Sequence, residues 1–264
     1  MSLTGKTKAS SYKDILQMNN SNSGVDTATR PIVDGEGTAS VLAMSDDNLY
    51  IQPNNDDTTA LLKVRAKGGA SLLVVDSANS LVKAGAGQHI VNTQFKTFGL
   101  WNFLPTADEH HPMTTIPMIT STSDSDFTGE VNGSGWGGTS TNPATSLTIS
   151  SASLELIPSL WVLQQDITID EIQYVISSSA ASTIGLKLMA YDMVAGALST
   201  SGDLSSGTLI ASLTAVVTGD DRITNGTISP STSNQDDNKV LVLFAQSSDT
   251  DKVTIQTTIK YHLR

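Results

Sequence analysis

Possible metal ligands gather at residues 108–111, where the sequence reads Asp-Glu-His-His. Adjacent side chains on an extended chain point in opposite directions, so one chain offers an ion at most one histidine together with Glu109. This is fewer than the four ligands of a tetrahedral zinc site, although three copies around an axis could each give one histidine. The alternative is a surface loop in which His110 and His111 form hydrogen bonds or face solvent. We favour the surface loop and predict no metal.

Two glycine-containing motifs resemble nucleotide-binding sequences but lack their context. The TGKT at residues 4–7 matches the end of a phosphate-binding loop without its upstream glycine or preceding strand. The GSGWGG at residues 133–138 follows no expected strand and opens no expected helix, as a dinucleotide site would require. This second motif favours a polar loop that presents Trp136.

Carboxylates and serines also give no catalytic pattern. Residues 123–130 supply three carboxylates without the remaining oxygen ligands of a calcium loop. No G-x-S-x-G motif marks a nucleophilic serine. A glycosidase pair among Asp166, Asp170 and Glu171 is not distinguished from solvated strand edges. We predict that the chain is not an enzyme and uses no cofactor.

The composition of the chain limits the classes of partner that we expect it to bind. The 264-residue chain has 38% hydrophobic residues, no cysteine and a net charge of -11, which argues against nucleic-acid binding. Residues 1–33 hold four cations and two carboxylates, a balance of +2, so the rest carries -13. The start has no apolar signal-peptide region, and no run reaches the ~18 residues of a membrane span. We expect a soluble protein, made in a cytoplasm, with no membrane insertion.

The first 44 residues predict an attachment arm. Ser11 and Asp14 have the spacing of a capping box, and the apolar period that follows predicts a short helix over residues 11–18. Such a helix is marginal in water, so we expect it to lie on another surface. Pro31 and two glycines at 35 and 37 then predict an extended, turning strap.

Residues 45–89 predict a rod of short strands. Apolar patches recur about every ten residues from Val41 to Val82, separated by turn formers, and no aromatic residue occurs between Tyr50 and Phe95. A single chain would have a thin core here. Association of identical chains around an axis would let each chain bury its stripe. The alternative is a simple meander packed on the following domain.

Residues 90–264 predict an antiparallel β-sandwich head of jelly-roll type, which makes the chain all-β. Apolar residues alternate with polar ones from Val253 to Leu263, the pattern of a strand with one buried face. We expect a long surface loop at residues 120–145, which are rich in Ser, Thr, Gly and Asn. Further strands are expected at 146–150, 159–164, 168–177, 184–193, 207–217, 222–229 and 239–246.

The string YKDILQMNNSNSGVDTATRPIVDGEGTASVL, at residues 12–42, resembles the start of virion structural proteins of tailed bacteriophages, especially marine ones. The strings SLWVLQQDITIDEIQYVIS, LKLMAYDM, STSGDLSSGTLIAS and TIKYHLR are similar to the C-terminal β domains of the same group. The resemblance covers residues 11–95 and 145–264. It implies a virion surface protein, often trimeric, that is attached to head or tail through its N-terminus.

We therefore expect a homotrimeric capsid decoration or short head fibre, assembled in the host cytoplasm and carried in the virion. Its arm would bind a capsid, tail or portal protein. The alternative is a tail fibre or receptor-binding adhesin that contacts host surface glycans through the loop carrying Trp136. The residues expected to attach the arm are Tyr12, Ile15, Leu16 and Met18, supported by Arg30.

Overall fold

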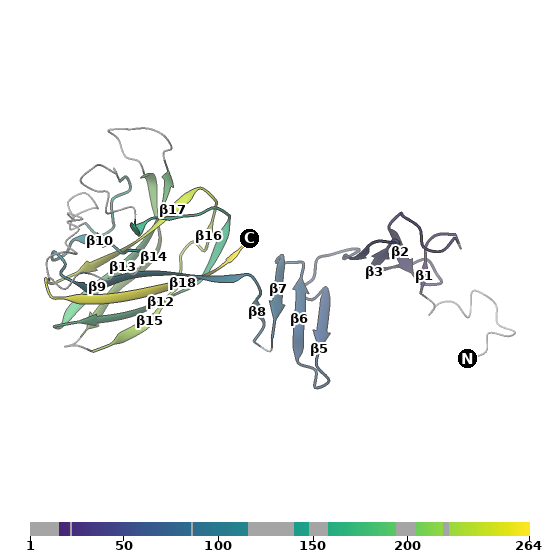
Figure 1. The fold of residues 1–264 in the computed structure, drawn as a ribbon, viewed down its shortest axis with the longest axis horizontal. Coiled ribbons are helices and arrows are strands. Elements are labelled where there is room, and N and C mark those ends of the chain that lie inside the picture. Colours follow the sequence, from purple (N-terminus) through teal and green to yellow (C-terminus); the bar gives the residue numbers. More distant parts are fainter. Residues whose placement is uncertain are drawn as a thin grey trace. The chain divides into compact units, whose positions relative to one another are not determined.

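The structure, a computed structural model, describes residues 16–21, 23–85, 87–115, 140–147, 158–193, 204–218 and 222–264 (Figure 1). In these ranges nearly all regular structure is β-strand, which confirms the predicted all-β class. The chain divides into two compact units, residues 1–91 and 92–264.

The first unit contains two four-stranded antiparallel sheets, each a simple meander. The turns between strands are tight, and Gly69 closes one of them with a φ of 87°, a conformation that side chains with a Cβ rarely adopt. The first sheet holds β1 (Gln17–Met18), β2 (Arg30–Val33), β3 (Ala39–Met44) and β4 (Leu49–Ile51). The second holds β5 (Leu62–Arg65), β6 (Ser71–Asp76), β7 (Leu81–Ala84) and β8 (His89–Ile90).

The helix predicted over residues 11–18 is wrong at its C-terminal end. Gln17 and Met18 form strand β1 and pair with Val33 and Ile32 of β2. The first residues of the predicted helix, 11–15, lie outside the described part of the chain. A two-turn apolar period cannot outweigh the cost of helix nucleation, whereas a neighbouring strand offers a backbone ladder at once.

The second unit is a sandwich of two five-stranded antiparallel sheets. The β9 sheet has the order β15-β12-β18-β9 with β16 beside β12, and the β13 sheet has the order β10-β17-β13-β14 with β11 beside β17. The strands are β9 (Thr93–Phe103), β10 (His110–Pro112), β11 (Trp161–Val162), β12 (Ile167–Ser178), β13 (Ser182–Met193), β14 (Leu204–Thr218), β15 (Thr224–Ile228), β16 (Asn234–Gln235), β17 (Lys239–Ser247) and β18 (Val253–Leu263).

The strand order is that of a jelly roll. Without the two-residue strands β11 and β16, the unit has eight strands. Numbered along the chain, one sheet takes them in the order 1-8-3-6 and the other in the order 2-7-4-5. This interleaving places strands that are distant in sequence side by side, as in two Greek keys folded together. The predicted jelly-roll sandwich is confirmed.

The main core lies between the two sheets. Alternate residues of each strand point into it, among them Phe98, Ile172, Leu186, Leu243 and Ile255, each buried. Strand β18 has the predicted bounds and lies between β12 and β9. It therefore joins two neighbours along most of its length.

The β13 sheet is buried on its other face as well. Met189, Tyr191, Val242 and Phe244 form a second cluster with Leu147 on that side. Their strands therefore read as continuous apolar runs rather than as alternating patterns.

The cover over this outer cluster includes the end of the segment predicted as a surface loop. Pro143 is buried, Ala144 packs against the second cluster, and Leu147 pairs with Leu204 through two backbone hydrogen bonds of 2.8 and 3.0 Å. Tyr191 Oη donates a 2.8 Å hydrogen bond to the Ala144 carbonyl. Residues 120–139 of the predicted loop lie outside the described residues.

Gly207 of β14 is expected to be required for this cover. A Cβ at this position would lie 2.5 Å from Tyr191 Cε1 and 2.9 Å from Thr145 Cα. We expect Gly207→Ala to lower the free energy of unfolding by ~1–3 kcal/mol, measured by denaturant unfolding followed by tryptophan fluorescence. All three tryptophans belong to the second unit.

The matched control is Gly185→Ala in the same sheet, where the nearest atoms would lie 3.8 Å away. The free energy of unfolding of this variant should equal that of the wild type. Equal losses in the two variants would contradict the proposed packing.

Candidate functional site

Of the residues expected to attach the arm, Tyr12 and Ile15 lie outside the described ranges. Leu16 is 62% exposed and precedes β1, while Met18 is half-buried within β1. Arg30 begins β2 and does not point freely outward, because its Nη2 lies 2.9 Å from Asp26 Oδ2.

Asp26 organises the loop between β1 and β2. Its carboxylate accepts hydrogen bonds from the side chains of Arg30 and Asn20 and from the Ala28 backbone N–H. The Arg30 guanidinium is the main cause of the lowered pKa of Asp26. Arg30 therefore holds its own loop in place.

The predicted strap over residues 27–40 folds into a hairpin. Strand β2 turns through Asp34–Gly37 into β3, and Asp34 Oδ1 accepts hydrogen bonds of 2.9 Å from the backbone N–H groups of Glu36 and Thr38. These backbone donors keep the pKa of Asp34 below its usual value, with the Thr38 N–H as the largest cause.

The prediction that His110 and His111 form a surface loop is wrong. Both belong to β10, pair with β17 and are buried. His110 Nε2 lies 2.9 Å from the Ser140 carbonyl, to which it donates, and its ring packs against Phe244. His111 Nε2 accepts a 3.1 Å hydrogen bond from the Thr106 backbone N–H.

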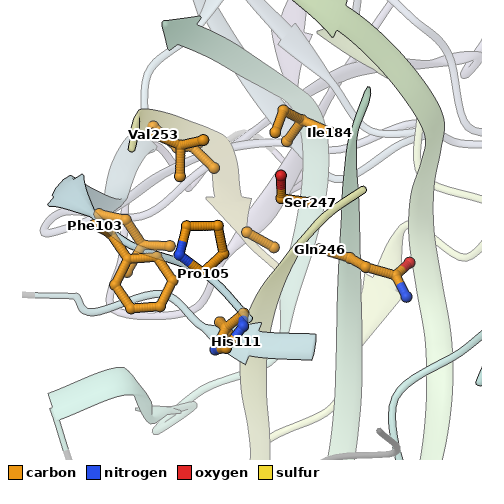
Figure 2. A pocket seen from close by; sticks show the side chains of 10 residues that line it. Phe103, Pro105, His111, Ile184, Gln246, Ser247 and Val253 are labelled. Carbon is orange, nitrogen blue, oxygen red and sulfur yellow. The ribbon is translucent and has the colours of Figure 1, made fainter. Parts of the chain in front are cut away.

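A small void beside His111 is too restricted for a ligand. It has a volume of about 10 Å³, enough for about one water molecule. Figure 2 shows Phe103, Pro105 and His111 around it, and the Phe103 and His111 rings lie 4.9 Å apart. The part of the chain that the structure describes contains no group of three or more side chains able to hold a metal ion.

The three carboxylates considered for catalysis make local contacts. Asp170 Oδ1 lies 2.9 Å from His262 Nδ1, and Asp166 accepts a hydrogen bond from the Asp237 backbone N–H. Glu171 accepts one from Gln173. These contacts tie β12 to the last strand and to the turn before β17.

The tryptophans are separated. Trp136 lies outside the described residues, and Trp101 of β9 is exposed. Trp161 of β11 contacts the rings of Phe98 and Tyr261, with centroids 6.3 and 4.9 Å away. Sequence reasoning missed this aromatic cluster because its members come from three strands far apart in the chain.

The second sheet of the first unit has an apolar side. In register, Leu62 lies beside Val75, which lies beside Val82. Partners in register share a face of the sheet, so these residues form a row across three strands. A second row runs parallel to it. We call the whole surface the open apolar face: Leu62, Val64, Leu73, Val75, Val82 and Ala84.

The opposite side of this sheet is mixed, because Leu72, Val74 and Leu81 lie there beside charged residues. Lys63, Asp76 and Lys83 lie there with Val74, and Lys83 Nζ is 2.7 Å from Asp76 Oδ2. This ion pair is the main cause of the lowered pKa of Asp76. The open apolar face therefore differs from the other side in that it carries no charged residue.

Among the described residues of the first unit, the open apolar face stays partly exposed. Val64 is 44% and Val82 is 41% exposed, and the other four residues are only partly buried. Among its described hydrophobic residues, only Val33 and Val74 are fully buried. The sequence signal was the set of short apolar patches with no aromatic residue among them.

Comparison with protein-family models and with curated proteins identifies no relative. No protein-family model matches the chain, and no curated protein matches its sequence. Within the described ranges, no helix is long and apolar enough to cross a membrane.

Stability should fall on mild acidification because of the β10 histidines. Burial lowers the pKa of both His110 and His111, and His110 Nδ1 has no hydrogen-bond partner among the described residues. The unfolded chain then binds protons that the folded chain does not, so the free energy of unfolding should decline as pH falls below about 6.5. The lowered aspartate pKa values act only below about pH 4.

The double variant His110→Gln/His111→Gln should flatten this decline. Denaturant midpoints from tryptophan fluorescence at several pH values between about 5 and 7.5 measure it. His89→Gln, at an exposed position, is the control and should keep the wild-type slope. An unchanged slope in the double variant would show that other groups cause the pH dependence.

Proposed function

We propose that the chain is a structural protein of a bacteriophage virion: a homotrimeric capsid decoration or short head fibre whose arm, residues 1–44, attaches it to the particle. The observation that carries this proposal is the open apolar face. A sheet with two rows of uncovered aliphatic side chains is stabilised by a partner that removes them from water.

Copies of the same chain fit this face better than an unrelated partner. The face carries no charged residue, whereas the chain as a whole has a net charge of -11 and copies repel each other elsewhere. Two faces, or three around an axis, would enclose a shared apolar core. The first unit has little core of its own, and sister chains are present wherever the protein is made.

Two parts of this proposal, the trimer and the location in the virion, come from the resemblance of residues 12–42 to phage virion proteins. The jelly roll adds support by analogy alone, because viral capsid domains use this fold and lectins use it too. Arm contacts repeated three times would raise the effective concentration at the particle surface, so each contact could be weak.

A tail fibre or adhesin is the second candidate. The aromatic cluster around Trp161 favours it, because aromatic rings exposed beside polar groups suit the binding of sugars. Copy number separates the candidates. A capsid decoration is present in proportion to the major capsid protein, and a tail fibre in proportion to a tail protein.

The assembly proposal predicts that a charge on the open apolar face separates the copies. Light scattering of the wild type should give about three times the 27.7 kDa of one chain. Val82→Asp should shift the mass towards one chain, because an interface would bury three unpaired carboxylates. Val82 is already partly exposed in the single chain, so the variant should still fold.

Leu72→Asp is the matched control. Leu72 lies next to Leu73 in β6 but points to the opposite side of the sheet, and it is also exposed. This variant should keep the wild-type mass. A wild-type monomer, or a Val82→Asp protein of unchanged mass, would contradict the proposal.

The attachment proposal predicts that Leu16→Asp leaves the trimer intact but reduces its incorporation into particles by ~10-fold or more, since all three arms weaken together. Quantitative mass spectrometry of purified particles measures the copy number. Val25→Asp is the control, because Val25 is 54% exposed in the same unit and has no proposed contact. Equal incorporation of the two variants would argue against attachment through Leu16.

A further inference from the structure

The second unit contains a cleft of about 460 Å³ that is broadly open to solvent. It is formed by β11 with the residues that follow it, the end of β18 and the start of β9. Trp161 and Tyr261 line it together with three glutamines, Gln94, Gln164 and Gln165.

Trp161, in the wall of the cleft, packs against two other aromatic rings. Phe98, which is fully buried, packs edge-on against Trp161. Tyr261 also packs against Trp161 and donates a 2.8 Å hydrogen bond from its Oη to Gln94 Oε1. Both lining rings remain partly exposed. Part of each ring is therefore open to a ligand at a fixed orientation.

The polar groups of the cleft are available for hydrogen bonds. Gln164 and Gln165 are exposed, and their side chains make no hydrogen bond to any residue that the structure describes. Gln94 Oε1 accepts the hydrogen bond from Tyr261, which leaves the amide N–H groups of Gln94 for a ligand. Each glutamine amide offers both donors and an acceptor, as a sugar hydroxyl does.

We infer that this cleft binds a neutral saccharide, with a sugar ring against Trp161 and Tyr261 and its hydroxyls hydrogen-bonded to the three glutamines. The inference does not depend on the virion proposal, because every residue in it belongs to the jelly roll.

Other ligand classes fit less well. None of the described residues that line the cleft is charged, so none of them would neutralise a phosphate, a carboxylate or an amine. An aliphatic ligand would cover three amides without giving them partners, at a cost in affinity. A proline-rich peptide would stack on the rings, but it offers few hydrogen-bond donors to the amide oxygens. Hydroxyl-rich rings satisfy both the aromatic wall and the amides.

The test uses the full chain and calorimetric titration with maltohexaose, mannohexaose and chitohexaose as neutral probes, an alginate hexamer as an acidic probe and a proline-rich peptide. We expect at least one neutral hexasaccharide to bind and the acidic probe not to bind. Gln164→Ala/Gln165→Ala should weaken that binding by ~10-fold or more, because two hydrogen-bonding side chains are lost. Both residues are exposed, so the variant should fold normally.

Trp101→Ala is the control, because Trp101 is an exposed aromatic residue of the same unit that does not line the cleft. It should bind like the wild type. The inference is overturned if no neutral hexasaccharide binds at about 10 mM. It is equally overturned if the alginate or the peptide binds instead, or if the glutamine double variant binds as the wild type does.

Discussion

An apolar sheet face must be covered, and the two units of this chain differ in whether they cover their own. In the jelly roll, both faces of the β13 sheet are buried by the chain itself, one by the β9 sheet and the other by a cover that includes residues 144–147. In the first unit, the open apolar face stays partly exposed among the residues that the structure describes. The proposed association of copies follows from this difference.

The jelly roll buries a large hydrophobic core between its own two sheets. Strand β18 lies between two long neighbours, and Arg264 at its end contacts Asp236 at 2.7 Å. The two histidines of β10 are buried, and a second hydrophobic cluster packs on the outer face of the β13 sheet. In the proposed assembly, the first unit makes the contacts between copies.

Much of the fold could be predicted from periodicity. The alternation from Val253 to Leu263 gives β18 to the residue, and the short apolar patches between residues 41 and 82 each overlap a strand. These features could be predicted because side-chain direction on a strand repeats every two residues, whatever lies around it. The turn formers between the patches supplied the strand ends.

Features that depend on distant contacts could not be predicted in this way. His110 and His111 read as polar loop residues, but β17 pairs with them and buries both. The Trp161 cleft needs β9, β11 and β18 to meet, and no local pattern indicates it. Gln17 and Met18 form a strand because β2 lies beside them, which outweighs a weak helical period. In each case tertiary pairing decides the outcome.

The most direct test of the central claim uses the absence of cysteine from the chain. A spin label on Val82→Cys reports whether the open apolar faces of different copies meet, and a label on Leu72→Cys reports the other side of the same sheet. Pulsed electron spin resonance should find strong dipolar coupling between Val82 labels, at shorter distances than between Leu72 labels. Uncoupled Val82 labels would contradict the account.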